Sequence, residues 1–121
     1  MNRTARHELA ERTFAARHVR MPARWVRAST TSPFDLMVLR PDGHRLRPTF
    51  VEIKTARGRR SSDLSEAEAE FGRFAELHGC AYVIARYRVT GHAVAGEQLY
   101  RPFAEPGTPP SEAELDSEVS K

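Results

Sequence analysis

Two stretches decide the fold of this chain: Ser32-Pro33-Phe34-Asp35-Leu36 and Phe50-Val51-Glu52-Ile53-Lys54-Thr55. Each is predicted to lie in a β-strand. Because successive side chains on a strand point to opposite faces, Glu52 and Lys54 share one face of the second strand. Val51 and Ile53 share the other face. The second strand therefore presents an acid and a base side by side.

A turn is predicted between the two stretches, at Pro41-Asp42-Gly43-His44. Proline presets φ and glycine accepts positive φ, so this tetrapeptide suits a reversal of the chain. If the hairpin centres between Gly43 and His44, the numbers of paired residues sum to 87 and Asp35 lies opposite Glu52. Opposed residues project from the same face, which would bring Asp35, Glu52 and Lys54 together. A bulge, or a longer loop through Pro48, would change this register.

The charged residues of the hairpin follow the pattern Asp-x16-Glu-x-Lys, with Pro33 two residues before Asp35. This pattern resembles the PD-(D/E)xK nuclease superfamily, which has the restriction-endonuclease-like fold. Three or four residues carry the resemblance, which covers roughly residues 5 to 90. The chain departs from the pattern because Phe34 separates the proline from the aspartate, a spacing that the superfamily tolerates.

The resemblance implies a role for each matching residue. Asp35 and Glu52 would be metal-binding carboxylates, joined by the backbone carbonyl of Ile53, and Lys54 would lie beside the attacking water. Mg²⁺ (or Mn²⁺) suits such a set, because hard cations prefer oxygen ligands. A carboxylate inside an apolar strand needs a metal or a cation to offset its desolvation. Lys54 would be that cation if the site were only a buried ion pair.

A helix is predicted over residues 3–18, which contain neither glycine nor proline and are rich in helix formers. Its weak stripe, with Phe14 off to one side, comprises Leu9, Thr13 and Ala16. In the resembled family an N-terminal helix often donates a glutamate to the metal site. Glu8 looks most like that residue, and Glu11 is the other candidate. The alternative is that both are solvated and pair with basic residues one turn away.

A second helix is predicted over residues 64–79, with Gly79 as its stop. Its predicted buried face comprises Leu64, Ala67, Phe71, Phe74, Ala75 and His78. Members of the resembled family place a glutamine or glutamate early in this helix, near the metal, and Glu68 matches by position. The stretch Ser65-Glu66-Ala67-Glu68 also spells a capping box, in which Glu68 reaches back to the helix start. The sequence favours neither interpretation of Glu68 over the other.

Further strands are predicted at residues 24–28 and 81–89, with an added edge strand at 92–101. The predicted fold is therefore α/β, with a restriction-endonuclease-like core in the order α-β-β-β-α-β. Its mixed central sheet is flanked by the N-terminal helix and the second helix. The chain also resembles the domains named after the plant NO VEIN protein and the replication-repair nuclease modules, which the sequence does not separate.

Charge is distributed unevenly along the chain. The whole chain carries +3, whereas residues 104–121 hold five acids and one lysine, or −4, which leaves +7 on residues 1–103. We expect residues 1–103 to form a single nuclease-like domain and residues 104–121 to be an acidic, Pro/Ser-rich disordered tail. A basic domain suits a nucleic-acid backbone. Arg57, Arg59 and Arg60, directly after the Glu-x-Lys strand, would clamp phosphates or belong to an ordinary solvated loop.

Composition excludes several other classes of protein. The single cysteine, Cys80, rules out an intramolecular disulfide framework and a Cys-rich zinc site. No run approaches the ~20 apolar residues that span a bilayer, and the N-terminus lacks the apolar stretch of a secretory signal. We therefore expect a cytoplasmic protein with no membrane partner.

These observations predict a metal-dependent endonuclease that hydrolyses phosphodiester bonds in DNA, either structure-selective or directed by a partner protein. Cutting both strands would need two active sites, which a homodimer would supply. One alternative is a non-catalytic nucleic-acid-binding or complex-assembly module of the same fold. Another is an RNA-processing nuclease that uses the same site, because no residue is identified that reads a 2′-hydroxyl.

Overall fold

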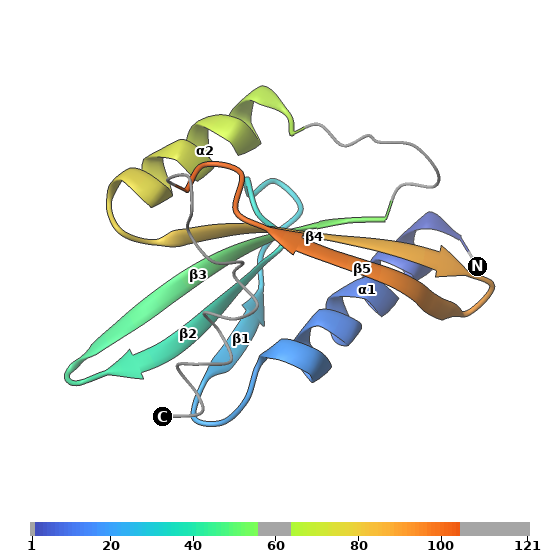
Figure 1. Cartoon of the computed structure of the whole chain (residues 1–121), viewed down its shortest axis with the longest axis horizontal. Coiled ribbons are helices and arrows are strands. Elements are labelled where there is room, and N and C mark those ends of the chain that lie inside the picture. The colour runs from blue at the N-terminus through green and yellow to red at the C-terminus, as the bar shows by residue number, and fades with distance from the viewer. Residues whose placement is uncertain (1, 56–63, 105–121) are drawn as a thin grey trace.

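The computed structural model describes residues 2–55 and 64–104 (Figure 1). In chain order its elements are α1 (Arg3–His18), β1 (Arg24–Arg27), β2 (Leu36–Asp42), β3 (Arg45–Lys54), α2 (Glu66–Leu77), β4 (Ala81–Thr90) and β5 (Ala93–Tyr100). Arg57, Arg59 and Arg60, and all of the predicted tail except Ala104, lie outside the described residues. Neither described helix is long and apolar enough to cross a membrane.

The strands form one mixed sheet in the order β1-β2-β3-β4-β5. Neighbouring strands are antiparallel except β3 and β4, which are parallel and are joined through α2. This arrangement confirms the predicted α/β class and the mixed sheet between two helices. The added edge strand predicted at residues 92–101 is confirmed as β5, which follows the predicted core and pairs with β4 at the edge of the sheet.

The β2–β3 hairpin has the predicted register. Its pairs run from Leu36↔Val51 to Asp42↔Arg45, and Gly43 has a φ of +65° in the turn. The register changes only where β2 begins, because the Asp35 N–H donates to the carbonyl of Val51 (2.8 Å), the residue that pairs with Leu36. Asp35 lies in the bend before β2, so its predicted pairing with Glu52 does not form. Asp35 therefore departs from the alternation that β2 otherwise follows.

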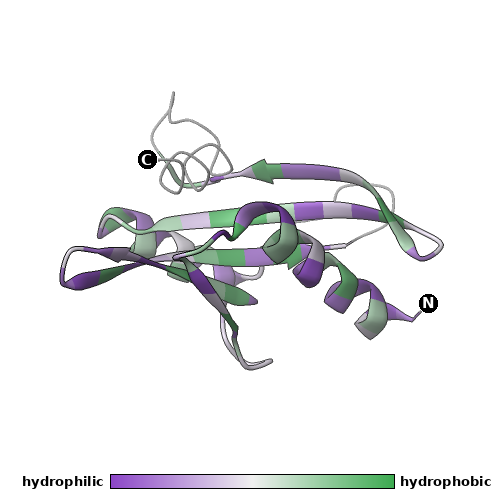
Figure 2. Cartoon of the chain, turned by 90° about the horizontal axis from the view of Figure 1, so that it is seen from below, coloured by the Kyte–Doolittle hydropathy of each residue, from purple (hydrophilic) through white to green (hydrophobic). Residues whose placement is uncertain are grey.

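Helix α1 packs on one face of the sheet through Ala10 and Phe14, both 0% exposed. Figure 2 shows hydrophilic and hydrophobic residues alternating along this helix, whose start is marked N. The predicted stripe of Leu9, Thr13 and Ala16 is wrong, since these residues are only partly buried or are exposed. The physical reason is the size of Phe14: burying its ring removes more apolar area from water than burying any one of those three side chains.

Helix α2 packs on the opposite face, where Ala75, Tyr82 and Ile84 form a second core cluster. The helix lies close, because a Cβ on Gly72 would come within 2.6 Å of the Phe103 ring and 2.8 Å of the Tyr82 ring. The predicted burial of Leu64, Phe71 and Ala75 is confirmed, since all three belong to this cluster. The predicted burial of the other three members of the predicted face is wrong, since these are exposed: Ala67, Phe74 and His78.

Candidate active site

The predicted site lies at the carboxyl end of β3, next to the start of α2. Glu52 is buried and Lys54 is half-buried, and the Lys54 Nζ lies 3.3 Å from Glu52 Oε2. The same Nζ lies 3.3 Å from Glu68 Oε1 on α2. The alternation of β3 places Glu52 and Lys54 on the face that α2 covers. One lysine thus lies between two carboxyl groups from different elements.

Glu68 fits both interpretations of its position. Its N–H donates to Ser65 Oγ (3.1 Å), and its Oε1 accepts from the Ser65 N–H (2.8 Å), so the predicted capping box is confirmed. The carboxylate that caps α2 is also the one that reaches Lys54. Its role as a metal ligand stays a prediction.

Asp35 is held from two sides. Its Oδ2 accepts a hydrogen bond from the Ile53 N–H (2.7 Å), and its Oδ1 lies 3.3 Å from His7 Nε2 on α1. Its place in the bend before β2 allows this carboxylate to reach both β3 and α1. The ion pair considered between Asp35 and Lys54 does not form, because Lys54 is engaged by Glu52 and Glu68 instead.

Helix α1 supplies Glu11 to this region. Glu11 is 3% exposed; its Oε1 accepts from Arg27 Nε (2.8 Å) and its Oε2 lies 3.3 Å from His7 Nε2. Within the described part of the chain, the ligand atoms of His7, Glu11 and Asp35 lie within 4.8 Å of one another. Glu8, which was the closer match in sequence, is not part of this group.

His7 was missed in the sequence, although a usable signal exists. It lies four residues before Glu11, a spacing that places both on one face of a helix. Glu11 lies three residues before Phe14, so a helix that buries Phe14 also turns Glu11, rather than Glu8, toward the sheet. Choosing Phe14 as the centre of the buried face would have predicted that Glu11 is the glutamate that faces the sheet.

The crowding of carboxyl groups shifts their protonation. Burial, together with the negative charge of Asp35, raises the pKa of Glu52 from 4.5 to about 9, against the opposing effect of Lys54. Burial alone would raise the pKa of Glu68, but hydrogen bonds from Ser65, Glu52 and Lys54 outweigh it and the pKa is lowered. The raised pKa of Glu52 and the lowered pKa of Glu68 favour a neutral Glu52 beside an ionised Glu68 at neutral pH.

The two basic residues of the site, His7 and Lys54, both have raised pKa values and so stay charged up to a higher pH. A hydrogen bond to Asp35 raises the pKa of His7 despite partial burial. Burial opposes the charge of Lys54, yet the carboxyl groups of Glu52 and Glu68 raise its pKa. Lys54 is therefore a fixed positive charge rather than a proton acceptor.

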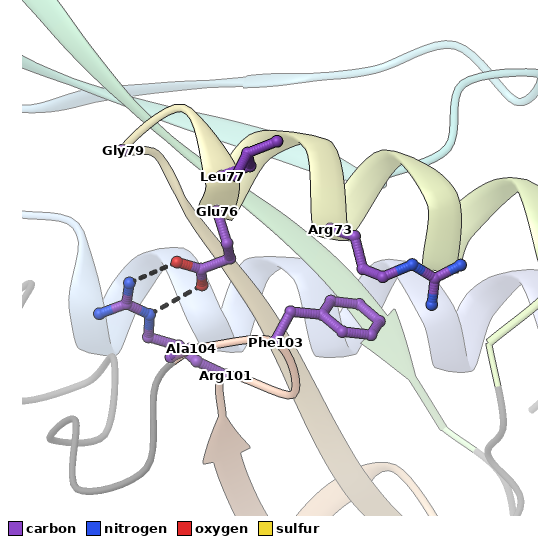
Figure 3. Close-up of a pocket in the computed structure, with 7 residues that line it drawn as sticks. All are labelled: Arg73, Glu76, Leu77, Gly79, Arg101, Phe103 and Ala104. Atoms are coloured by element: carbon purple, nitrogen blue, oxygen red, sulfur yellow. Dashed lines mark hydrogen bonds and ion pairs between the residues drawn. The ribbon is translucent and has the colours of Figure 1, made fainter.

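A cavity of about 520 Å³ lies elsewhere, at the carboxyl end of α2 (Figure 3). The Arg101 guanidinium donates two hydrogen bonds to the Glu76 carboxylate, at 2.9 and 2.6 Å, and the Arg73 guanidinium lies 5.4 Å from the centre of the Phe103 ring. The ion pair between Arg101 and Glu76 thus joins α2 to the segment after β5. None of the predicted site residues lines this cavity.

No family model matches the chain, and no curated protein or solved structure is similar enough to it to count as a match. The resemblance to the nucleases therefore depends on the residues and on the geometry described above.

Proposed function

We propose that this chain is a metal-dependent phosphodiesterase that cleaves DNA. The observation that carries the proposal is the set of acids around the end of β3: Glu52 and Glu68 each lie 3.3 Å from Lys54 Nζ, and the charge of Asp35 raises the pKa of Glu52. Asp35 itself lies within 4.8 Å of ligand atoms of His7 and Glu11. A buried carboxyl group such as Glu52 beside two further acids is costly unless a cation joins them. Perturbed carboxyl groups of this kind also concentrate at catalytic sites.

The residues present fit a hard divalent cation. Asp35, Glu52 and the Ile53 carbonyl would hold Mg²⁺ (or Mn²⁺), with Glu68 as a further candidate, because all are oxygen donors. His7 and Glu11 would then orient Asp35 from the α1 side, as residues behind metal ligands do. A bound ion of this kind polarises a phosphate and lowers the pKa of a water.

Lys54 serves the reaction electrostatically. Its raised pKa keeps the ammonium charged, so it stabilises the negative charge that develops on a phosphate during attack. The capping box holds Glu68 at the start of α2, and Glu68 in turn holds the Lys54 ammonium in place. Helix α2 therefore positions the charge that β3 carries.

A second candidate function is a non-catalytic nucleic-acid-binding or assembly module, and one observation favours it. Each acid of the site already has a protein partner: Ile53 N–H for Asp35, Lys54 for Glu52, Ser65 N–H for Glu68 and Arg27 for Glu11. A site satisfied in this way would remain folded without any metal. An RNA-processing nuclease would use the same residues on a different substrate.

Calorimetric titration with Mg²⁺ and Mn²⁺ tests the proposal on the wild type and the Asp35→Asn and Glu52→Gln variants. Asp42→Asn, at an exposed aspartate in the hairpin turn, is the matched control. We expect binding by the wild type and the control, a loss of at least about tenfold in both site variants, and metal-dependent cleavage that follows binding.

Cleavage is measured on matched single- and double-stranded DNA and RNA, which also distinguishes a DNA nuclease from an RNA-processing nuclease. No metal binding by the wild type, with Asp35→Asn lowering only the melting temperature, would establish the non-catalytic module instead.

A further inference from the structure

We propose that Arg86 and Arg88 on β4 bind the phosphodiester backbone of a nucleic-acid strand that continues from Lys54 across the sheet. We call Lys54, Arg86 and Arg88 the cationic strip. This inference rests on the proposed function, because it concerns the substrate of the same site. Nothing in the sequence alone marks these two arginines, which lie more than thirty residues after Lys54.

The parallel pairing of β3 and β4 creates the strip. Arg86 is the partner of Lys54 in the register, so the two side chains lie next to each other on the same face of the sheet. Arg88 lies two residues further along β4, roughly 7 Å away, and points to the same face. The strip therefore begins at the candidate active site and leads away from it.

Helix α2 does not cover this part of the sheet. It packs on Tyr82 and Ile84 in the first half of β4, which belong to its core cluster, and Arg86 and Arg88 do not. Figure 1 shows the second half of β4, together with β5, running past the amino-terminal start of α2. Arg88 is exposed and Arg86 is half-buried, so within the described chain a ligand on the α2 side can reach Arg88 freely and Arg86 in part.

Neither arginine has a carboxylate partner within residues 2–55 and 64–104. Arg86 Nη2 donates to the Tyr100 hydroxyl (2.9 Å) and its guanidinium lies 5.7 Å from the Tyr100 ring centre, while its Nε is buried without a hydrogen-bond partner. Arg27 and Arg101, by contrast, each face a glutamate. A half-buried cation without an anion is costly, which indicates that an anion from a ligand pairs with Arg86.

Arg88 is held across β5. Its Nη2 donates to the Ala95 carbonyl (3.3 Å), and a Cβ on Gly96 would come within 3.3 Å of the same nitrogen. Gly96 pairs with Arg88 in the register and leaves room for this guanidinium on the sheet. The planar fork of arginine suits two oxygens of one phosphate, and two arginines on one strand suit two phosphates.

The occupant is a phosphodiester chain rather than an isolated anion, because the strip continues from Lys54 and the carboxyl groups beside it. A strand whose scissile phosphate lies at Lys54 places its neighbouring phosphates over Arg86 and Arg88. The acids at one end and the cations along the strip then fix where along the strand the candidate site acts.

The test is fluorescence anisotropy with labelled single- and double-stranded oligonucleotides, in EDTA and between about 50 and 200 mM salt. The full chain is compared with Arg86→Gln/Arg88→Gln and with a control of equal charge change, Arg12→Gln/Arg20→Gln, on and just after α1 at exposed positions. We expect the strip variant to bind about tenfold or more weakly and its salt slope to fall by roughly 1 to 2, with the control unchanged.

Two further variants guard against unfolding. Arg88→Gln alone, at an exposed position, is expected to reduce the salt slope by about 1, and Arg86→Lys, which keeps the charge, is expected to retain most of the affinity. Wild-type affinity and slope in the double variant, an equal loss in the control, or no binding by the wild type would each overturn the inference.

The two proposals fail differently. A wild type that binds through the strip but never cleaves, with or without Mg²⁺, contradicts the nuclease and leaves the strip standing. Cleavage that depends on Asp35 but is unchanged in Arg86→Gln/Arg88→Gln supports the nuclease and removes the strip.

Discussion

At the scale of a single residue, the burial of Glu52 lowers the free energy of unfolding at neutral pH. Burial and the charge of Asp35 keep its carboxyl group protonated up to a pKa of about 9, whereas the same group in the unfolded chain ionises near 4.5. Between these values the folded state binds more protons than the unfolded state, so the free energy of unfolding falls as pH rises. Such a cost is typical of a residue kept for function rather than for stability.

Glu52→Gln is therefore expected to stabilise the metal-free protein. The amide cannot ionise, so the gain is small at pH 5 and grows to about 1–3 kcal/mol at pH 8. Thermal unfolding in EDTA at the two pH values measures it. A fall in melting temperature at both values would mean that Glu52 stabilises the fold through its ion pair with Lys54, as the non-catalytic reading requires.

At the scale of elements, each helix is oriented by one contact that its own periodicity does not reveal. On α1 the contact is Phe14, and on α2 it is Gly72 against Tyr82 and Phe103. These contacts turn Glu11 and Glu68, respectively, toward the sheet. The orientation of each helix therefore also decides which of its glutamates joins the candidate site.

Phe14→Ala is expected to lower the free energy of unfolding by about 3–5 kcal/mol, because it empties the centre of the α1 contact. Leu9→Ala, on the partly buried side of the same helix, is expected to cost less than about 2 kcal/mol. Urea unfolding of the two variants compares them. Equal losses would indicate that α1 packs through the stripe predicted from its sequence.

Gly72→Ala is expected to destabilise the protein although alanine favours a helix over glycine by about 1 kcal/mol. Its Cβ would come within 2.8 Å of the fully buried Tyr82 ring, so the helix or the ring must move, at about 1–3 kcal/mol. Glu70→Ala, at an exposed position of the same helix, is the control. A rise in urea midpoint for Gly72→Ala would contradict the close approach of α2 to β4.

At the scale of the whole molecule, a cluster of three polar side chains joins the end of α1 to the β5 edge of the sheet. His18 Nε2 and the Tyr87 hydroxyl lie 3.0 and 2.7 Å from Glu97 Oε2, which connects α1, β4 and β5. Burial alone would raise the pKa of Glu97, but the hydrogen bonds of His18 and Tyr87 lower it. The stabilisation from ionised Glu97 is therefore present above its ordinary pKa and is lost as pH falls through the lowered value.

Glu97→Gln is expected to reduce the free energy of unfolding by about 1.5–3 kcal/mol at pH 7, the scale of hydrogen bonds to a charged group. The difference from the wild type should shrink as pH falls below the ordinary range of a glutamate, because the wild-type carboxylate is then protonated too. Urea unfolding across pH 3 to 7 follows this difference. A constant difference over that range would show that the charge of Glu97 contributes nothing.

The sequence by itself determined the features that depend on near neighbours in the chain. Both helices, the turn at Gly43, the capping box of Ser65 and Glu68, and the hairpin register follow from local spacing and from alternation along a strand. Glu52 and Lys54 were placed correctly for the same reason: two residues on one strand share a face whatever the rest of the chain does.

Only the tertiary structure decided which distant residues join them. The bend at Asp35 brings that carboxylate to His7 and the Ile53 N–H. The burial of Phe14 selects Glu11, and the parallel pairing of β3 with β4 brings Arg86 beside Lys54. Each of these depends on packing between elements well separated in the chain. Such packing is set by side-chain volume and strand pairing, which a local pattern of polar and apolar residues does not encode.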